Sequence, residues 1–334
     1  GGPPGTGAPP AGRGARPPAA SCSPCLARAA SGPAGRSRRR ARLAGLCVYG
    51  AVPVGLNALA TGRWAGLVAY GLAPWLLSVL ARGSGIAPYG PRADDPAAAH
   101  RVPPLLTSVV RQVLGVGVVG ALLGLLAPVG TLLPAAVAVL LVAGGLLVGQ
   151  LRGALRLILT GVAGSAVAVA LHLPFAIGAA EDPNWATLVG TWLPAPGQLS
   201  TGAIVRFETG PHGASLLLYG ILLGAALPLV IAKRWRLSWA ARGWVVALGG
   251  WGLLWVTARG DVPRGLPDPE LLLAPGAAGL ALAAAMGVAA FEVDLSDYRF
   301  GWRQAVSVGA LAALVAGFVP VLGASLSGSW DMPA

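Results

Sequence analysis

The chain has 334 residues, of which 55% are hydrophobic and only 11% are charged, and its mean hydropathy is +0.70. Soluble domains carry about 25% charged residues, so this chain lacks the polar side chains needed to cover a water-soluble fold. The net charge of +12 does not indicate nucleic-acid binding, because the basic residues gather in an N-terminal arm and at the ends of apolar runs. Composition therefore excludes an ordinary soluble enzyme and predicts a protein whose first partner is a lipid bilayer, with no nucleic acid.

Residues 1–42 are rich in Pro, Gly and Arg and contain no apolar run, which predicts a disordered basic arm. Residues 43–334 are expected to form the transmembrane domain. Because the chain begins at Gly1 rather than Met, we expect it to be a piece of a longer protein. Cys22 and Cys25 form a single C-x-x-C pair without further ligands nearby, so no metal site is predicted there.

The domain contains repeated apolar runs of about 18–22 residues, the length that crosses a hydrocarbon core of about 30 Å. No segments alternate as the strands of a membrane β-barrel do. The expected fold class is all-α, a polytopic transmembrane helical bundle of about nine spans. In chain order, the predicted spans are Leu43–Leu59, Trp64–Leu80, Leu105–Leu126, Thr131–Val148, Leu157–Phe175, Ser215–Ala232, Ser238–Ala258, Leu271–Ala290 and Ala305–Leu326.

The distribution of Lys and Arg between the loops predicts that the N-terminus lies inside, because cytoplasmic loops are enriched in these residues. With that orientation the inside loops carry Arg82, Arg92, Arg101, Arg152, Arg156, Lys233, Arg234, Arg236, Arg242, Arg299 and Arg303. The outside loops carry only Arg63, Arg206, Arg259 and Arg264. The expected location is the plasma membrane.

Small residues spaced four apart predict close helix packing, since backbones can approach where side chains are absent. The pairs are Gly120 with Gly124, Gly145 with Gly149, and Gly220 with Gly224. Prolines within the spans predict kinks. They are Pro53, Pro74, Pro134, Pro228 and Pro320.

The first predicted outside turn places Arg63 between two apolar runs, directly before Trp64. One interpretation is that the arginine extends to lipid headgroups while Trp64 anchors the interface. The other is that Arg63 lines an outward cavity and binds an anionic group such as a lipid phosphate. Asn57, one or two helical turns earlier, and the adjacent Trp64 would then share that substrate-binding role.

The longest predicted outside segment, residues 176–214, is too long for a simple turn and combines charges with indoles. Glu181 and Asp182 are the candidate catalytic residues, because carboxylates act as general bases and hold divalent cations. Indoles stack on the apolar faces of sugars. The candidate substrate-binding residues of this segment are Trp185, Trp192, Arg206, Glu208 and His212. The alternative is an amphipathic loop that its tryptophans anchor in the interface.

All twelve acidic residues lie outside the predicted spans. A proton-coupled carrier usually keeps an ionisable group within the bilayer, so this distribution weighs against a transporter. Arg111 and His172 are the strongest polar candidates inside spans, and a transporter would need a wet path between them.

Three phrases of the sequence carry a resemblance. "AAFEVDLSDYRFGWRQ" and "VLGASLSGSWDMP" resemble the membrane region of actinobacterial cell-envelope glycosyltransferases of family 2, and "NALATGRWAGLVAYGLAPWLL" is similar to actinobacterial arabinofuranosyltransferase-like proteins of the GT-C class. The resemblance implies a polyprenyl-phosphate sugar donor and a glycan acceptor. GT-C enzymes place an acidic residue in the first outside loop, whereas this loop has none, so the resemblance supplies no catalytic residue.

We therefore expect the membrane part of a cell-envelope glycosyltransferase that acts with a polyprenyl-linked sugar, with a divalent cation as the one candidate cofactor. The alternatives are a transporter or flippase for a lipid-linked glycan, and a non-catalytic membrane anchor of an enzyme domain.

Overall fold

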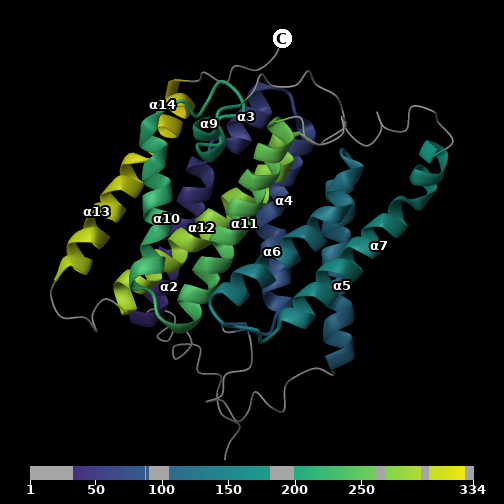
Figure 1. Ribbon diagram of the computed structural model, residues 1–334, viewed down its shortest axis with the longest axis horizontal. Coiled ribbons are helices and arrows are strands. Elements are labelled where there is room, and N and C mark those ends of the chain that lie inside the picture. The colour runs from purple at the N-terminus through teal and green to yellow at the C-terminus, as the bar shows by residue number, and fades with distance from the viewer. Residues whose placement is uncertain are drawn as a thin grey trace, which may run out of the picture.

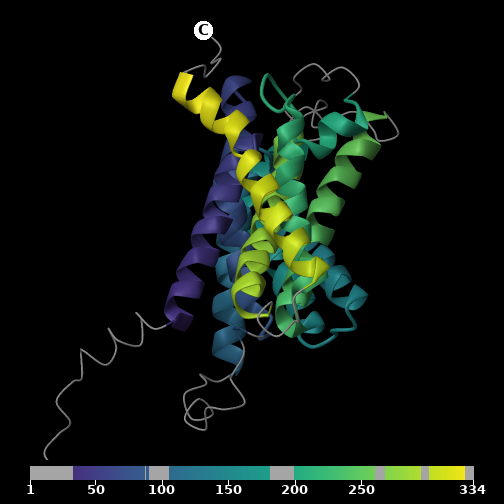
Figure 2. The same cartoon turned by 90° about the vertical axis from the view of Figure 1, so that its left-hand side faces the viewer.

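The computed structural model describes residues 33–86, 88–89, 105–180, 199–259, 268–294 and 301–327, and every regular element in these ranges is a helix. The main helices run side by side as a bundle (Figures 1 and 2). The elements are α2 Pro33–Ala51, α3 Val54–Ala60, α4 Trp64–Gly83, α5 Leu105–Gly124, η1 Pro128–Leu132, α6 Leu133–Leu147, α7 Ala154–Ala180, α9 Thr201–Val205, η2 Leu216–Leu218, α10 Tyr219–Ile231, α11 Arg234–Ala258, α12 Pro269–Val293, α13 Trp302–Ala316 and α14 Val319–Ser327.

Each predicted span corresponds to one of these helices or to a consecutive pair, which confirms the all-helical fold class. Six helical segments of the described residues are long and apolar enough to cross a membrane. That all nine segments cross, and that the N-terminus lies inside, stay predictions. The expected basic arm, residues 1–42, lies outside the described residues except for the start of α2.

Prolines divide two of the predicted spans. The span at Leu43–Leu59 is interrupted before α3, where Pro53 occupies the N-cap position. The last span is divided into α13 and α14, and Pro320 is the second residue of α14. Pro74 and Pro228 lie inside continuous helices, whereas Pro134 lies in the first turn of α6, where its missing N–H costs no hydrogen bond.

Helix α12 lies at the centre of the bundle and contacts α2, α4, α10 and α11. Of its apolar window, 78% is buried within the protein, compared with 22% for the segment formed by α13 and α14. Figure 1 shows α12 and α11 between the α10–α13 pair on one side and the α5–α7 pair on the other. The exposed surfaces of the outer helices are rich in Leu and Val, as expected of side chains that face lipid.

Glycine allows a close approach of α11 and α12. A Cβ atom added at Gly243 would lie 2.3 Å from the carbonyl oxygen of Gly279, and one added at Gly279 would lie 2.4 Å from the carbonyl oxygen of Gly243. Neither residue belongs to the predicted glycine pairs. Packing in lipid depends on such close contact, since apolar side chains gain little by leaving an apolar solvent.

Two of the three predicted glycine pairs do lie at helix contacts. Gly220 and Gly224 face Ala313 and Leu314 of α13. Gly120 and Gly124 likewise face close neighbours, among them Ala168 and His172 of α7. The third pair is wrong as a packing motif, because Gly145 contacts Arg242 but Gly149 lies in a turn with φ +68° and nothing nearby.

We distinguish the two ends of the bundle by their elements. The upper end in Figure 1 carries α3, α9 and α14, and the lower end carries the start of α2 and the turn between α6 and α7. At the lower end Asp294 accepts hydrogen bonds from Arg236 Nε at 2.9 Å and from the Lys233 backbone N–H at 3.1 Å. Burial alone would raise the pKa of Asp294, but these bonds outweigh it and lower that pKa.

Replacing Gly243 by Ala tests the close approach of α11 and α12. We expect a loss of roughly 1–3 kcal/mol, because the new methyl group collides with a backbone carbonyl that cannot rotate away. Gly252→Ala is the matched control in the same helix, where a Cβ meets nothing within 4 Å. The control should be neutral or stabilising, since Ala favours the helix by about 1 kcal/mol over Gly. Denaturant unfolding in detergent measures both, and equal stability of the two variants would contradict this packing.

Candidate functional site

The candidate site lies at the upper end, where α3 turns into α4 beneath the loop that follows α9. The turn has Gly62 at φ +68°, a backbone conformation that glycine adopts without strain. It lets α4 begin directly after Arg63, so that Asn57 and Arg63 approach the same loop from two helices.

Asn57 holds this loop through all of its side-chain polar atoms. Its Nδ2 donates to the carbonyl oxygens of Phe207 at 3.0 Å and His212 at 2.8 Å, and its Oδ1 accepts the backbone N–H of His212 at 2.9 Å. Asn57 is fully buried, and a Cβ added at Gly210 would lie 2.9 Å from its Oδ1. The loop backbone is strained in the left-handed region at Phe207, with φ 59°. The Asn57 amide therefore fixes the shape of residues 207–212.

Arg63 forms an ion pair with Glu270 inside the bundle. Its Nη1 lies 2.7 Å from Glu270 Oε1 and 3.4 Å from the carbonyl oxygen of Thr209. The arginine is 9% exposed and the glutamate is fully buried. Gly66 of α4 makes this possible, because a Cβ there would lie 2.6 Å from the Cβ of Glu270. Arg63 thus joins α4, α12 and the loop after α9.

The position of Glu270 corrects the prediction that every acidic residue lies outside the spans. Helix α12 begins at Pro269, before the predicted start at Leu271, and so includes the carboxylate. The sequence signal was present, since an Asp followed by Pro is typical of a helix N-cap and first turn. Its partner, 207 residues away along the chain, had no such signal.

Asp268 adds a second negative charge to the site as the N-cap residue of α12. It is 8% exposed. Burial raises the pKa of Asp268, and the positive charge of Arg63 acts in the opposite direction. Arg63 therefore forms an ion pair with Glu270 and also acts through its charge on Asp268. Arg63 Nε and Glu270 Oε2 are both buried without a hydrogen-bond partner. The pair therefore still has one donor and one acceptor to offer to another group.

Arg206 organises the other side of the loop. It pairs with Glu208 at 2.7 Å, donates to the carbonyl oxygen of Gly213 at 3.2 Å and to the Tyr219 hydroxyl at 3.3 Å. The hydrogen bond with Glu208 raises the pKa of Arg206, so this guanidinium stays charged. His212 joins the cluster through its backbone contacts with Asn57.

The structure thus brings together several predicted binding residues from distant segments: Asn57, Arg63, Arg206, Glu208 and His212. Trp64 lies on the outside of the bundle with 63% of its surface exposed, consistent with its predicted place at the interface. The predicted catalytic pair Glu181 and Asp182, with Trp185 and Trp192, lies outside the described residues. Glu270, Asp268, Thr209 and Tyr219 are members of the cluster that the sequence analysis did not assign.

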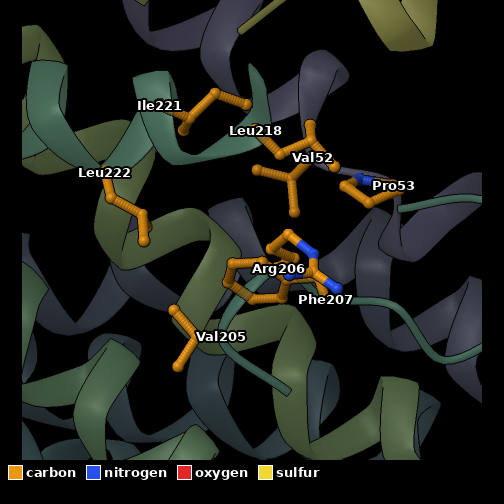
Figure 3. Close-up of a pocket in the computed structure, with 8 residues that line it drawn as sticks. All are labelled: Val52, Pro53, Val205, Arg206, Phe207, Leu218, Ile221 and Leu222. Carbon is orange, nitrogen blue, oxygen red and sulfur yellow. The ribbon is translucent and has the colours of Figure 1, made fainter. Parts of the chain in front are cut away.

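A small recess opens beside the cluster (Figure 3). It is lined by Val52, Pro53, Val205, Arg206, Phe207, Leu218, Ile221 and Leu222. Its cavity volume is about 10 Å³, which is room for about one water molecule. A sugar therefore does not fit this recess in the conformation described.

Within the described ranges no three His, Cys, Asp or Glu side chains gather as they would around a metal ion. The predicted divalent cation, assigned to Glu181 and Asp182, is therefore not tested by these residues. The chain matches no protein-family model, no curated protein and no solved structure.

Removing one partner of the buried pair should be far more costly than removing both. Arg63→Gln leaves Glu270 charged and unpaired in the bundle, and we expect a loss of about 3–5 kcal/mol. Arg63→Gln combined with Glu270→Gln should recover most of that loss, because two neutral amides carry no buried charge. Unfolding of both variants in detergent measures the difference.

Glu208→Gln is the control for this comparison, since it removes the acid of a more exposed ion pair. Its cost should stay below about 1 kcal/mol. An Arg63→Gln variant as stable as this control would show that the buried pair does not stabilise the fold.

Proposed function

We propose that this chain is the membrane part of a cell-envelope glycosyltransferase, and that its upper end receives a polyprenyl-phosphate sugar on the outer side of the plasma membrane. The observation that carries the proposal is the buried Arg63–Glu270 pair under a shaped loop. Ionisable groups inside a membrane bundle are costly and are typically functional. The phrase of sequence that resembles arabinofuranosyltransferase-like proteins also contains both Asn57 and Arg63.

The chemistry of Arg63 fits a lipid-linked phosphate. A guanidinium group presents a planar fork of donors that matches two phosphate oxygens. Glu270 holds this group in place, while the Nε atom of Arg63 remains without a hydrogen-bond partner. In the proposed complex, the phosphate takes up the unused donors of Arg63, and Glu181 or Asp182 acts as the general base toward the glycan acceptor.

A flippase for a lipid-linked glycan is the second candidate, and the buried carboxylate of Glu270 favours it, because carriers keep such groups in the bilayer. The wet path between Arg111 and His172 that a transporter would need has less support. Along it, α5 and α7 pack tightly, with Cβ positions at Gly117 and Gly164 lying 2.6 Å from Val167 and 2.4 Å from Val116. Transfer of a sugar is therefore the better-supported reaction.

The double variant Arg63→Gln with Glu270→Gln separates a catalytic role from a structural one, because it removes the charges without leaving one unpaired. We expect membranes that carry this variant to contain normal amounts of folded protein. Sugar transfer to envelope glycan should fall by at least 90%. The donor is polyprenyl-phosphoryl arabinofuranose or another sugar from a panel of polyprenyl-phosphate donors. Gly252→Ala, in α11 away from the site, should retain transfer. Full transfer by the double variant would remove the proposed role of the pair.

A lack of transfer by the unaltered full-length protein with every donor of the panel would contradict the glycosyltransferase itself. Movement of the labelled lipid across vesicle membranes in the same preparations would identify the flippase instead.

A further inference from the structure

The lower end of the bundle carries an uneven distribution of charge. Two acidic residues are described there, Glu292 and Asp294, and both lie at the end of α12. Glu292 pairs with Arg40 of α2 at 3.0 Å, and Asp294 pairs with Arg236 of α11 at 2.5 Å. Both described carboxylates of this end therefore form ion pairs on the side of α2, α11 and α12.

The opposite side of the same end has cations without such partners. Arg82 lies in the last turn of α4, Arg152 in the turn before α7, and Arg156 in the first turns of α7. Arg82 and Arg152 are exposed and Arg156 is partly exposed. No described carboxylate pairs with any of the three. The sequence that links α4 to α5 holds two Asp and two Arg, so it brings no net charge to offset them.

Two glycines allow the turn after α4 and the turn before α7 to come into contact. Gly85 and Gly153 have φ +63° and φ +77°, and a Cβ at Gly153 would lie 2.3 Å from the carbonyl oxygen of Ser84. A Cβ at Gly85 would lie 3.0 Å from Arg156 Nη1. The Ser84 hydroxyl fixes the first turn by accepting the Ile86 N–H at 3.1 Å. The positive charges of two separate helices are thus held at one fixed junction.

An apolar track begins at the same junction. Leu155, Leu159 and Val162 are spaced along one face of α7, with 72%, 54% and 50% of their surfaces exposed. They extend from the arginines along the exposed side of α7, away from the lower end. A ligand with an anionic head and long apolar chains would meet both features.

We propose that the junction of α4 and α7, formed by Arg82, Arg152 and Arg156, binds the phosphate of an anionic phospholipid whose acyl chains lie along the exposed face of α7. Arginine pairs bidentately with phosphate oxygens. Basic clusters between helices at a membrane border are suited to anionic headgroups, at about 1 kcal/mol per cation. We expect the side of α2, α11 and α12 to bind such lipid less well, because two of its cations, Arg40 and Arg236, already have carboxylate partners.

Native mass spectrometry of the full chain in detergent tests the site, with dioleoyl phosphatidylglycerol and dioleoyl phosphatidylcholine as probes. We expect phosphatidylglycerol to bind more tightly by at least tenfold. Arg82→Gln, Arg152→Gln and Arg156→Gln together should weaken phosphatidylglycerol binding at least tenfold and leave phosphatidylcholine binding unchanged. The exposed single variant Arg152→Gln, whose side chain the fold does not need, should weaken it about fivefold.

The matched control removes three exposed cations from the other side of the same end, as Arg39→Gln, Arg42→Gln and Arg234→Gln, and should change binding less than threefold. An equal loss of phosphatidylglycerol binding in both triple variants would show that the lipid is attracted by the charge of the whole end and not by this site. That result would overturn the proposal. Undiminished binding by Arg152→Gln and by the junction triple variant would do the same. Displacement of the lipid by millimolar inorganic phosphate would show that the acyl chains do not contribute, which would also overturn it.

Discussion

The ion pair between Arg63 and Glu270 is the constraint around which the upper end of this protein is arranged. A charge pair that is 9% and 0% exposed gains little unless its geometry is kept and its remaining polar atoms are served. Helix α4 supplies the arginine, and α12, the most buried helix, supplies the carboxylate. The loop after α9 contributes the Thr209 carbonyl oxygen. Moving α4 or α12 away from the other would leave a charge in apolar surroundings.

Glycine at the contact surfaces is what allows this arrangement. Gly66 brings the start of α4 against Glu270, and Gly243 with Gly279 brings α11 against the same central helix. Within lipid there is no hydrophobic gain from hiding leucine, so close backbone approach and satisfied polar groups must hold the helices together. The polar pair and the glycine contacts therefore act on the same helix, α12, from different sides.

The two ends of the bundle use charge in different ways. At the upper end, the Arg63 guanidinium group is enclosed and paired with a carboxylate 207 residues away, and Asn57 shapes the loop that contacts it. At the lower end most arginines are exposed, and only those near the end of α12 meet a described carboxylate. An enclosed pair favours a built site for one ligand group, and exposed cations favour contact with a membrane surface.

The sequence by itself determined the class of the protein and the positions of its helices. Lipid cannot form hydrogen bonds with the backbone, so a segment that crosses it must be a helix of sufficient length and apolar along that length. Such runs can be recognised in the sequence without knowing how the helices pack. It also indicated Asn57 and Arg63, because polar groups between two apolar runs are rare. The start of α12 was predicted two residues late, which hid Glu270 from the list of buried acids.

Only the tertiary structure decided which polar groups meet. Arg63 was expected at headgroups or in an open cavity, yet its partner comes from a helix far along the chain. The Gly243–Gly279 contact was likewise hidden, because each glycine lies on a different helix and no spacing within one helix records it. Local periodicity determines which segments become helices, whereas the pairing of their faces depends on shape and charge matched across segments distant in sequence.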